Sequence, residues 1–287
     1  MGRITNILFP VAFSSSCIGM GAYVKRVAEL FDARVSLLHV FDRASHNGLE
    51  MYVRPADEIA LEHEELARQK LDAFLQFKLP APQYSRILAS GAVVSEIALT
   101  ARGGFDLIMM ATHAGVFRRM LLVSTTSRVL NEIGCPVITS EHAEVVAPRP
   151  MAHREMLCAI GLGENSERVL RYAHQLSREA HANFRILHAI DAGDSMILAE
   201  GERDELTESE ALQEAHERIN ELQRRVGSQA KVRIAKGPIK RALIEDAKES
   251  DADLLIIGRR PQPNIYARAR DLTLAMVRDS PYPVLSI

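Results

Sequence analysis

The last stretch of the chain is a second version of a stretch in its middle. Residues 106–140 read DLIMMATHAGVFRRMLLVSTTSRVLNEIGCPVITS, and residues 252–287 hold the same parts in the same order. In each, an apolar run is followed by a long basic loop, a short amphipathic helix and a Pro-Val strand. The apolar runs Leu107–Met110 and Leu254–Ile257 are typical of parallel strands that are buried on both faces. The chain must therefore adopt a fold in which this unit occurs twice.

The repeat extends through both halves of the sequence. SLLHVFD at 36–42 matches RILHAID at 185–191, an offset of 149 residues, and Gly91 matches Gly237 at an offset of 146. The Pro-Val segments at 136–137 and 283–284 match at an offset of 147 residues. Offsets this steady indicate that a whole domain is duplicated, because self-similarity at a fixed spacing marks a repeated structural unit.

The repeat predicts two domains, residues 1–142 and 153–287, with a linker at about residues 143–152. The segment between the copies has little periodicity and carries two prolines in APRP, which is typical of a connection. A chain of 287 residues also has the length for two domains of ordinary size.

The composition excludes several classes of protein. Net charge is −2, so no general electrostatic attraction to nucleic acid or to an anionic membrane is expected. The N-terminus has no cleavable leader pattern, and no apolar run has the length of a membrane span. The sequence predicts a cytoplasmic protein that binds neither nucleic acid nor membrane.

Strand and helix patterns alternate throughout, which predicts an α/β fold. The expected fold is two tandem, doubly wound, five-stranded, mostly parallel sheets of Rossmann-like type, because parallel strands need helical crossovers that cover both faces. Two helices have clear apolar stripes. The first stripe consists of Ile18, Ala22, Val24, Val27, Ala28 and Phe31, and the second of Ile59, Leu66, Leu71, Phe74 and Leu75.

The expected strands are 4–11, 34–41, 84–89, 106–111, 136–140, 155–160, 184–190, 230–236, 253–258 and 284–287. The expected helices are 16–32, 55–77, 93–102, 124–133, 165–181, 203–226 and 239–249, with one more before the last strand.

The two closing strands, 137–140 and 284–287, raise the question of what covers their free edges. An unpaired edge strand is a template for association. We therefore predict that the two halves pack as a pseudo-dimer about a pseudo-two-fold axis through these strands.

Several motifs together resemble the universal stress protein family. In the first half they are ILFPVAFSSS at 7–16, LLHVFD at 37–42, MMATHAG at 109–115 and VLNEIGCPVI at 129–138. In the second half they are AIGLGENSE at 159–167, ILHAID at 186–191, AKGPIKRALIEDAKESDADLLIIGRR at 235–260 and SPYPVLSI at 280–287. The resemblance implies a fold like that of the adenine nucleotide alpha hydrolases, dimer-like pairing through the last strand and, in one branch of the family, ATP binding.

The nucleotide-binding branch of the family uses an Asp after the first strand, a small residue ending the second, and a loop of pattern Gly-x-x-Gly, nine residues, Gly-Ser/Thr. Both halves depart from it. The first half has Ala12, Val40, Ala111, Ala114, Ser124 and Thr125 at these positions, with Thr112, His113 and Gly115 between them. The second half has Gly161, Ala189, Gly258, Pro261, Asp271 and Leu272.

These departures have different costs in the two halves. An Ala at a positive-φ position costs about 1–2 kcal/mol, and Pro removes a backbone donor. Ser124 and Thr125, with Arg118 and Arg119 nearby, still offer hydroxyls and N–H groups to an anion. Asp271 instead places a carboxylate where phosphate would lie, at a cost of roughly 1–4 kcal/mol at about 4 Å. The first half is expected to bind an adenine nucleotide at most weakly, and the second not at all.

Other conspicuous residues are predicted to be structural. His39 and His188 lie in matched strands without metal-ligand spacing, and no catalytic or metal-binding residue is predicted. His113 is expected to be an exposed loop residue, with a ligand contact as the alternative. The pairs Arg118–Arg119 and Arg259–Arg260 are expected to form surface ion pairs, with anion binding as the alternative. Turn chemistry is predicted for Asp42, Asp191 and GLGENS at 161–166, and buried free thiols for Cys17, Cys135 and Cys158.

Two functions follow from the sequence. The leading one is a non-catalytic cytoplasmic universal stress protein with degenerate nucleotide sites, acting through an unidentified protein partner, with homo-oligomerisation left open. No cofactor is required, although ATP or another adenine nucleotide fits the first half. The alternative is an ATP-binding switch or weak ATP hydrolase that uses the loop 111–125.

Overall fold

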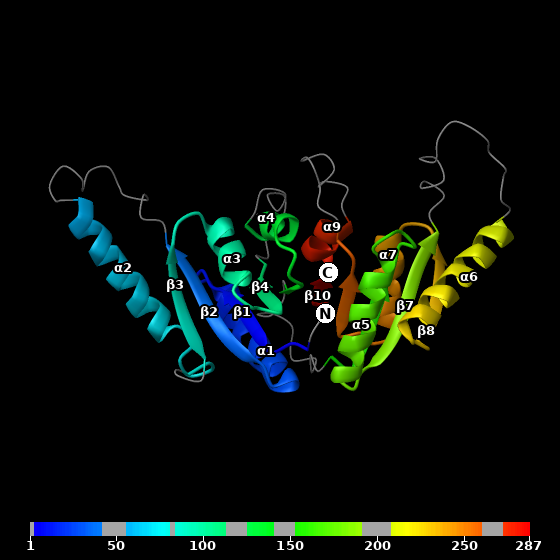
Figure 1. Ribbon diagram of the computed structural model, residues 1–287, viewed down its shortest axis with the longest axis horizontal. Coiled ribbons are helices and arrows are strands. Elements are labelled where there is room, and N and C mark those ends of the chain that lie inside the picture. Colours follow the sequence, from blue (N-terminus) through cyan, green and yellow to red (C-terminus); the bar gives the residue numbers. More distant parts are fainter. Residues whose placement is uncertain are drawn as a thin grey trace, which may run out of the picture. The chain divides into compact units, whose positions relative to one another are not determined.

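The computed structural model describes residues 3–41, 56–80, 84–112, 125–140, 153–190, 208–259 and 272–287 (Figure 1). These residues form two compact units, one containing the described residues up to 140 and the other those from 153 onward. Within the described residues, no helix has the length and hydrophobicity that crossing a membrane requires.

The first unit is a parallel sheet of five strands with helical crossovers. The strands lie in the order β3-β2-β1-β4-β5, so the direction of the crossovers reverses after β3. Its elements are β1 (Asn6–Pro10), α1 (Ser15–Phe31), β2 (Arg34–Phe41), α2 (Ala56–Ala73), β3 (Ser85–Ser90), α3 (Val93–Ala101), β4 (Leu107–Ala111), α4 (Thr125–Glu132) and β5 (Val137–Ser140).

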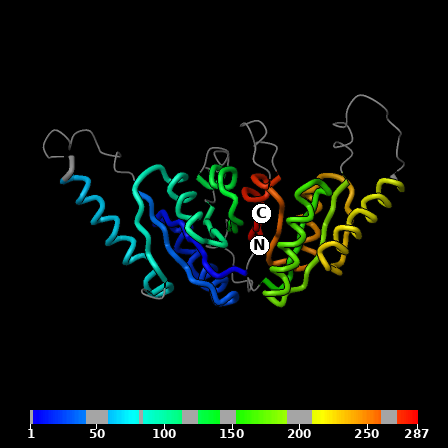
Figure 2. Tube along the Cα trace, in the orientation of Figure 1, coloured from blue at the N-terminus to red at the C-terminus, as the bar shows by residue number. Residues whose placement is uncertain are grey.

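The second unit repeats this arrangement, with the strands in the order β10-β9-β6-β7-β8. Its elements are β6 (Glu155–Ala159), α5 (Ser166–Glu179), β7 (Asn183–Ile190), α6 (Glu208–Val226), β8 (Lys231–Lys236), α7 (Ile239–Glu249), β9 (Leu254–Ile257), α9 (Leu272–Asp279) and β10 (Val284–Ser286). Figure 2 traces the same path through each unit by colour.

Both faces of each sheet are covered. Because crossovers between parallel strands are right-handed, the reversal after β3 places α1 and α2 on one face of the first sheet and α3 and α4 on the other. The same rule pairs α5 with α6 and α7 with α9. The central strands form the core, and Ile7, Leu8, Phe9, Leu107 and Ile108 are fully buried. Burial on both faces explains their uninterrupted apolar sequence.

The repeat is visible in matched turns as well as in the strands. Asp106, just before β4, accepts hydrogen bonds from the backbone N–H groups of Thr5 and Asn6 at 2.9 and 3.0 Å. Asp253, before β9, accepts the equivalent bonds from Arg154 and Glu155 at 2.8 and 3.2 Å. These carboxylates fix the starts of β1 and β6 beside the central strands.

Two matched glycines form the turns that follow the edge strands. Gly91 and Gly237 have φ values of 146° and 90°, which only glycine adopts without strain. The N–H of Gly91 donates to the carbonyl of Phe41 at 3.2 Å, and that of Gly237 to Ile190 at 2.9 Å. The glycine turn predicted at both positions is therefore present.

The expected fold class, element order and strand positions are confirmed, and the element bounds lie within a few residues of those expected. The apolar stripes are partly wrong, because Ile18, Ala22 and Leu66 are exposed. Cys135 is only half-buried, whereas Cys17 and Cys158 are buried, and none of the three forms a disulfide. The predicted linker lies outside the described residues, and the pseudo-dimer remains a prediction.

Candidate functional site

The predicted nucleotide site of the first unit lies at the edge of the sheet where β1, β2 and β4 end. Parallel pairing of β1 with both neighbours brings these carboxyl ends together. Of the predicted site residues, the structure places Ala12, Val40, Ala111, Thr112 and Thr125 at this edge or at the start of α4. His113, Ala114, Gly115 and Ser124 lie outside the described residues, as do Arg118 and Arg119.

The turn after β1 brings an exposed residue to the site and holds the next in a strained conformation. Ala12 is exposed, and Phe13 has a φ of 55°, in the left-handed region. The Phe13 ring packs against His39, with ring centroids 4.2 Å apart, and against Phe74 at 5.3 Å. In the second unit Leu162 has a φ of 53° and follows the exposed Gly161. The turn geometry is thus repeated, but neither copy presents a carboxylate.

The matched histidines have a structural partner at this edge. His39 Nδ1 lies 2.9 Å from the carbonyl oxygen of Val11, and His188 Nδ1 lies 2.9 Å from that of Ile160. A carbonyl oxygen only accepts, so Nδ1 carries the proton and donates in both rings. Each imidazole therefore ties the end of the second strand to the loop after the first.

The end of β4 carries a buried hydroxyl group without a partner. Ala111 lies opposite Ser140 of β5, and the Thr112 N–H donates to the carbonyl of Ser140 at 3.2 Å. The Thr112 side chain is 2% exposed, and its Oγ1 makes no hydrogen bond within the part of the chain that the structure describes. A buried hydroxyl in this state costs about 1–3 kcal/mol. Thr112 is therefore a site residue whose buried hydroxyl keeps unused hydrogen-bonding capacity among the described residues.

In the second unit, side chains contact the backbone around the equivalent site. A Cβ added at Gly258 would lie 2.9 Å from Val169 Cγ2, so this glycine makes room for α5 and does not serve a positive φ. Thr273 Oγ1 is 3.5 Å from the Gly258 carbonyl, and Arg218 Nη2 donates to the carbonyl of Leu162 at 2.7 Å. Pro261 and Asp271 lie outside the described residues.

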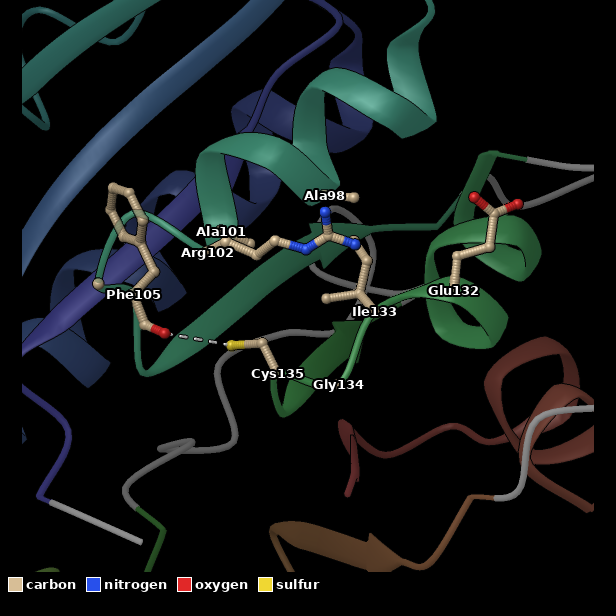
Figure 3. A pocket seen from close by; sticks show the side chains of 9 residues that line it. Ala98, Ala101, Arg102, Phe105, Glu132, Ile133, Gly134 and Cys135 are labelled. Carbon is tan, nitrogen blue, oxygen red and sulfur yellow. Dashed lines mark hydrogen bonds between the residues drawn. The ribbon is translucent and has the colours of Figure 1, made fainter.

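A cavity that the sequence did not reveal lies at the opposite edge of the first sheet (Figure 3). It has a volume of about 470 Å³ and lies where α3 and α4 end, with Arg102, Phe105, Glu132 and Cys135 among its lining residues. The Cys135 thiol donates to the carbonyl of Phe105 at 3.5 Å. The only sequence signal is that Cys135 stands where the other half has the larger Tyr282.

Two cavities lie at the corresponding edge of the second sheet. Their volumes are about 560 and 420 Å³, and His174 and Arg178 line both. Burial lowers the pKa of His174, and the charge of Arg178 lowers it further. Among the described residues, no group of three or more His, Cys, Asp and Glu side chains could hold a metal ion.

Comparison with known proteins gives one consistent picture. The universal stress protein family matches residues 3–140 and again residues 153–287. Universal stress protein A homolog 2 of Coxiella burnetii is 28% identical over 138 residues, which are 47% of this chain and 94% of that protein.

Two solved structures are similar over almost the whole chain. A universal stress protein from Archaeoglobus fulgidus DSM 4304 has a TM-score of 0.69 at 18% identity, covering 99% of this chain and 96% of that one. A functionally unknown protein from Pseudomonas aeruginosa PAO1 has a TM-score of 0.58 at 16% identity, covering 99% and 92%. At these identities the two likenesses show the α/β fold alone.

Proposed function

The chain belongs to the universal stress protein family, and we propose that it is a non-catalytic cytoplasmic member that acts through protein interaction. The family fits a role in the stress response. In this proposal both nucleotide sites are degenerate, the first unit retains at most weak binding of an adenine nucleotide, and the second binds none.

The observation that carries the proposal is the missing carboxylate after the first strand of each unit. Ala12 and Gly161 are both exposed at that position, and the strained residues after them, Phe13 and Leu162, keep the turn that would present a side chain there. A carboxylate on a rigid turn accepts hydrogen bonds from amino or hydroxyl groups of a ligand. Neither Ala nor Gly has a side chain that accepts, so affinity is lost although the backbone is kept.

The first unit keeps part of what anion binding needs. Thr112 has a buried hydroxyl that makes no hydrogen bond among the described residues, and Thr125 begins α4, where the first N–H groups of a helix lack partners within the helix. These features support weak binding. They also support the alternative function, an ATP-binding switch or weak ATP hydrolase using the loop 111–125.

The surroundings of the equivalent site in the second unit are different, with the buried Arg259 at the position of Thr112. Val169 packs against Gly258, so the backbone there is covered by a side chain of α5. Arg218 already donates to the Leu162 carbonyl, and in the sequence Asp271 precedes the first residue of α9. A carboxylate at a helix N-terminus competes with phosphate for the same N–H groups. This supports a purely structural second unit.

Titration of the purified chain with ATP tests the proposal. We expect wild type to bind more weakly than about 100 µM, which corresponds to about −5.5 kcal/mol. Ser124→Asp should abolish this binding through charge repulsion, whereas Ala12→Asp should tighten it by about tenfold by restoring the acceptor. Micromolar binding that survives Ser124→Asp would contradict the proposal, and ATP turnover lost in that variant would favour the alternative.

A further inference from the structure

The helices on one face of each sheet can be compared residue by residue. Tyr23 of α1 and Tyr172 of α5 are both buried, and Asp32 and His181, which follow these helices, both have a φ of 52°. These pairs fix the offset between α1 and α5 at 149. In α2 and α6 the buried residues Ala67 and Ala215, like Leu71 and Ile219, fix it at 148.

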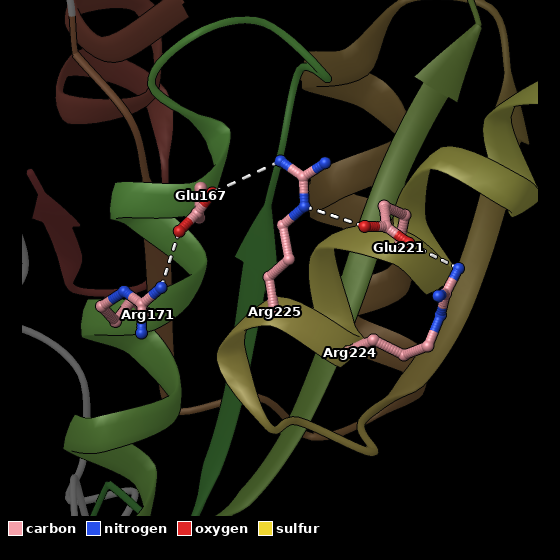
Figure 4. A network of polar contacts seen from close by, with 5 residues as sticks. All are labelled: Glu167, Arg171, Glu221, Arg224 and Arg225. Carbon is pink, nitrogen blue, oxygen red and sulfur yellow. Dashed lines mark hydrogen bonds and ion pairs between the residues drawn. The ribbon is translucent and has the colours of Figure 1, made fainter.

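In the second unit an ion-pair network joins the two helices (Figure 4). Glu167 of α5 lies 2.6 Å from Arg171 Nη2 and 3.8 Å from Arg225 Nη1 of α6. Glu221 lies 2.9 Å from Arg225 Nε and 2.5 Å from Arg224 Nη2. The hydrogen bond from Arg225, together with the charge of Arg224, lowers the pKa of Glu221. This face is therefore covered by mutually satisfied charges.

The first unit has no charge at any of the five positions that these offsets give. Glu167, Arg171 and Glu221 correspond to Ile18, Ala22 and Ala73, and Arg224 and Arg225 match Gln76 and Phe77 by offset alone, because α2 ends at Ala73. All five are exposed, and Ile18 is 47% exposed while Phe77 is fully exposed. We call these five residues the α1–α2 surface.

The backbone around this surface also differs between the units. The Leu75 side chain lies 2.8 Å from where a Cβ on Gly21 would be, so the end of α2 packs closely on α1. Leu75 has a φ of 54°, and α2 ends at Ala73, whereas α6 continues to Val226. Exposed apolar residues that cluster on a helix pair mark interaction sites more often than scattered ones do.

The charges beside the α1–α2 surface are mainly positive. Arg26, Lys70 and Lys78 make no ion pair or side-chain hydrogen bond within the described residues, while Lys25 pairs with Glu29 at 3.9 Å. Between residues 66 and 78, Asp72 is the acidic residue. A second copy of the chain would present the same excess of cations and be repelled, whereas an acidic partner would be attracted.

We propose that the α1–α2 surface binds an amphipathic segment of a partner protein in which aliphatic or aromatic side chains are flanked by carboxylates. The inference deepens the proposed function, because it names the surface and the partner chemistry of the protein interaction. Ile18 and Phe77 supply the apolar contact, and Arg26, Lys70 and Lys78 supply complementary charge.

Fluorescence anisotropy of the full chain with three labelled peptides tests the proposal. The probe is a helical peptide of about 16 residues with Leu and Phe on one face and Glu on the other. One control peptide has Lys for every Glu, and the other has Ser for every Leu and Phe. The protein variants are Ile18→Glu with Phe77→Arg, which carries the second unit's residues into the first, and Leu61→Ser. Leu61 is exposed but lies about 120° around α2 from Ala73 and outside the surface.

We expect the acidic peptide to bind wild type and Leu61→Ser with a similar Kd, and the double variant at least about tenfold more weakly. High salt should weaken binding, and neither control peptide should bind comparably. Thermal melting checks that the variants fold, and Phe77→Arg alone serves if the double variant does not.

Three results would overturn the proposal. They are no binding of the acidic peptide, equal binding of the Lys peptide, or binding that the double variant leaves unchanged. Self-association of wild type that the double variant abolishes would identify a second copy as the occupant and overturn it as well. The peptide titrations are repeated with saturating ATP. Tight ATP binding would contradict the degenerate sites without changing the peptide result. Absence of peptide binding would contradict the α1–α2 surface without changing the result for ATP.

Discussion

Arg86 and Arg233 both lie in the third strand of their units, but on opposite faces of the sheet and with different partners. Arg86 pairs in register with Leu37, whereas Arg233 pairs with Leu187, the counterpart of Leu38, so the two positions are one residue apart. The Arg86 guanidinium donates to four backbone carbonyls, those of Leu71, Phe74, Leu79 and Tyr84, at 2.7–3.3 Å. Arg233 instead pairs with two carboxylates of α7, Asp246 at 2.7 Å and Glu249. Burial lowers the pKa of Arg86, whereas the hydrogen bonds that Arg233 donates to Asp246 and Glu249 raise the pKa of Arg233.

The comparison shows that two units with the same strand order hold a cation of the third strand in different ways. In the first unit the cation closes the turn after α2, and the neighbouring surface carries Ile18 and Phe77. In the second unit charges are paired with charges, both at Arg233 and in the network of Glu167 and Arg225. The two units thus satisfy their charged side chains differently, although their backbones are alike.

The largest expected effect comes from removing Arg233, the cation that pairs with the buried Asp246 in the second unit. Asp246 is 1% exposed, so Arg233→Met would leave a buried carboxylate without its cation. We expect a loss of about 3 kcal/mol in the free energy of unfolding, at the lower end for buried pairs because Arg233 is 39% exposed. Urea denaturation followed by amide hydrogen exchange would assign the loss to the second unit.

A matched pair of variants sharpens this comparison. Replacing both partners, as in Arg233→Met with Asp246→Leu, should recover most of the loss, since no charge stays buried. Arg86→Met should cost about 2 kcal/mol through unsatisfied carbonyls, and no second substitution can relieve it. If a second substitution recovered the free energy of unfolding equally in both units, or in neither, the two arginines would be stabilised by the same kind of partner.

The next effect depends on pH and concerns His153, which stands where the first unit has Ile4. Both side chains are buried, and burial lowers the pKa of His153 to about 4. The unfolded chain titrates near 6.5, so it binds the proton first as pH falls. Stability is therefore full above pH 6.5 and is lost as pH falls toward 4, by about 2 kcal/mol between pH 7.5 and 5.

Substitution by the first unit's residue tests this assignment. In His153→Ile, urea denaturation at pH 7.5 and 5 should show a pH-dependent loss smaller by about 2 kcal/mol than in wild type. An unchanged pH dependence would mean that other groups carry the acid sensitivity of the second unit.

The smallest expected effect concerns the first helix of each unit. The Ser14 side chain accepts a hydrogen bond from the Cys17 N–H at 3.3 Å and caps α1, whereas Asn165 at the start of α5 makes no such bond. Ser14→Ala should therefore cost about 1 kcal/mol and Asn165→Ala only a few tenths. Thermal denaturation of both variants measures the difference, and equal losses would contradict the assigned caps.

Much of the fold could be predicted because the repeat and the buried strands leave strong patterns. Leu107–Met110 and Leu254–Ile257 are continuous apolar runs, and each glycine turn marks the end of an edge strand. The apolar stripe of α1 was wrong at Ile18 and Ala22, because periodicity shows which side is apolar but not whether a neighbouring helix covers it.

The candidate site was predictable in position but not in detail. The carboxyl edge follows from strand order, and Ala12 and Gly161 could be read as missing acceptors. The buried hydroxyl of Thr112, which has no hydrogen bond among the described residues, could not be predicted, because burial and hydrogen bonding at a strand end depend on packing against β5. The role of Gly258 was also hidden, since its contact with Val169 joins residues far apart in sequence.

The central claim is that neither unit has a competent nucleotide site, and the nucleotide content of the freshly purified chain tests it most directly. Acid extraction and chromatography would quantify adenine nucleotide per chain. A site weaker than about 100 µM loses its ligand during purification, so the account predicts well below about 0.1 nucleotide per chain. Close to one ATP per chain would contradict it.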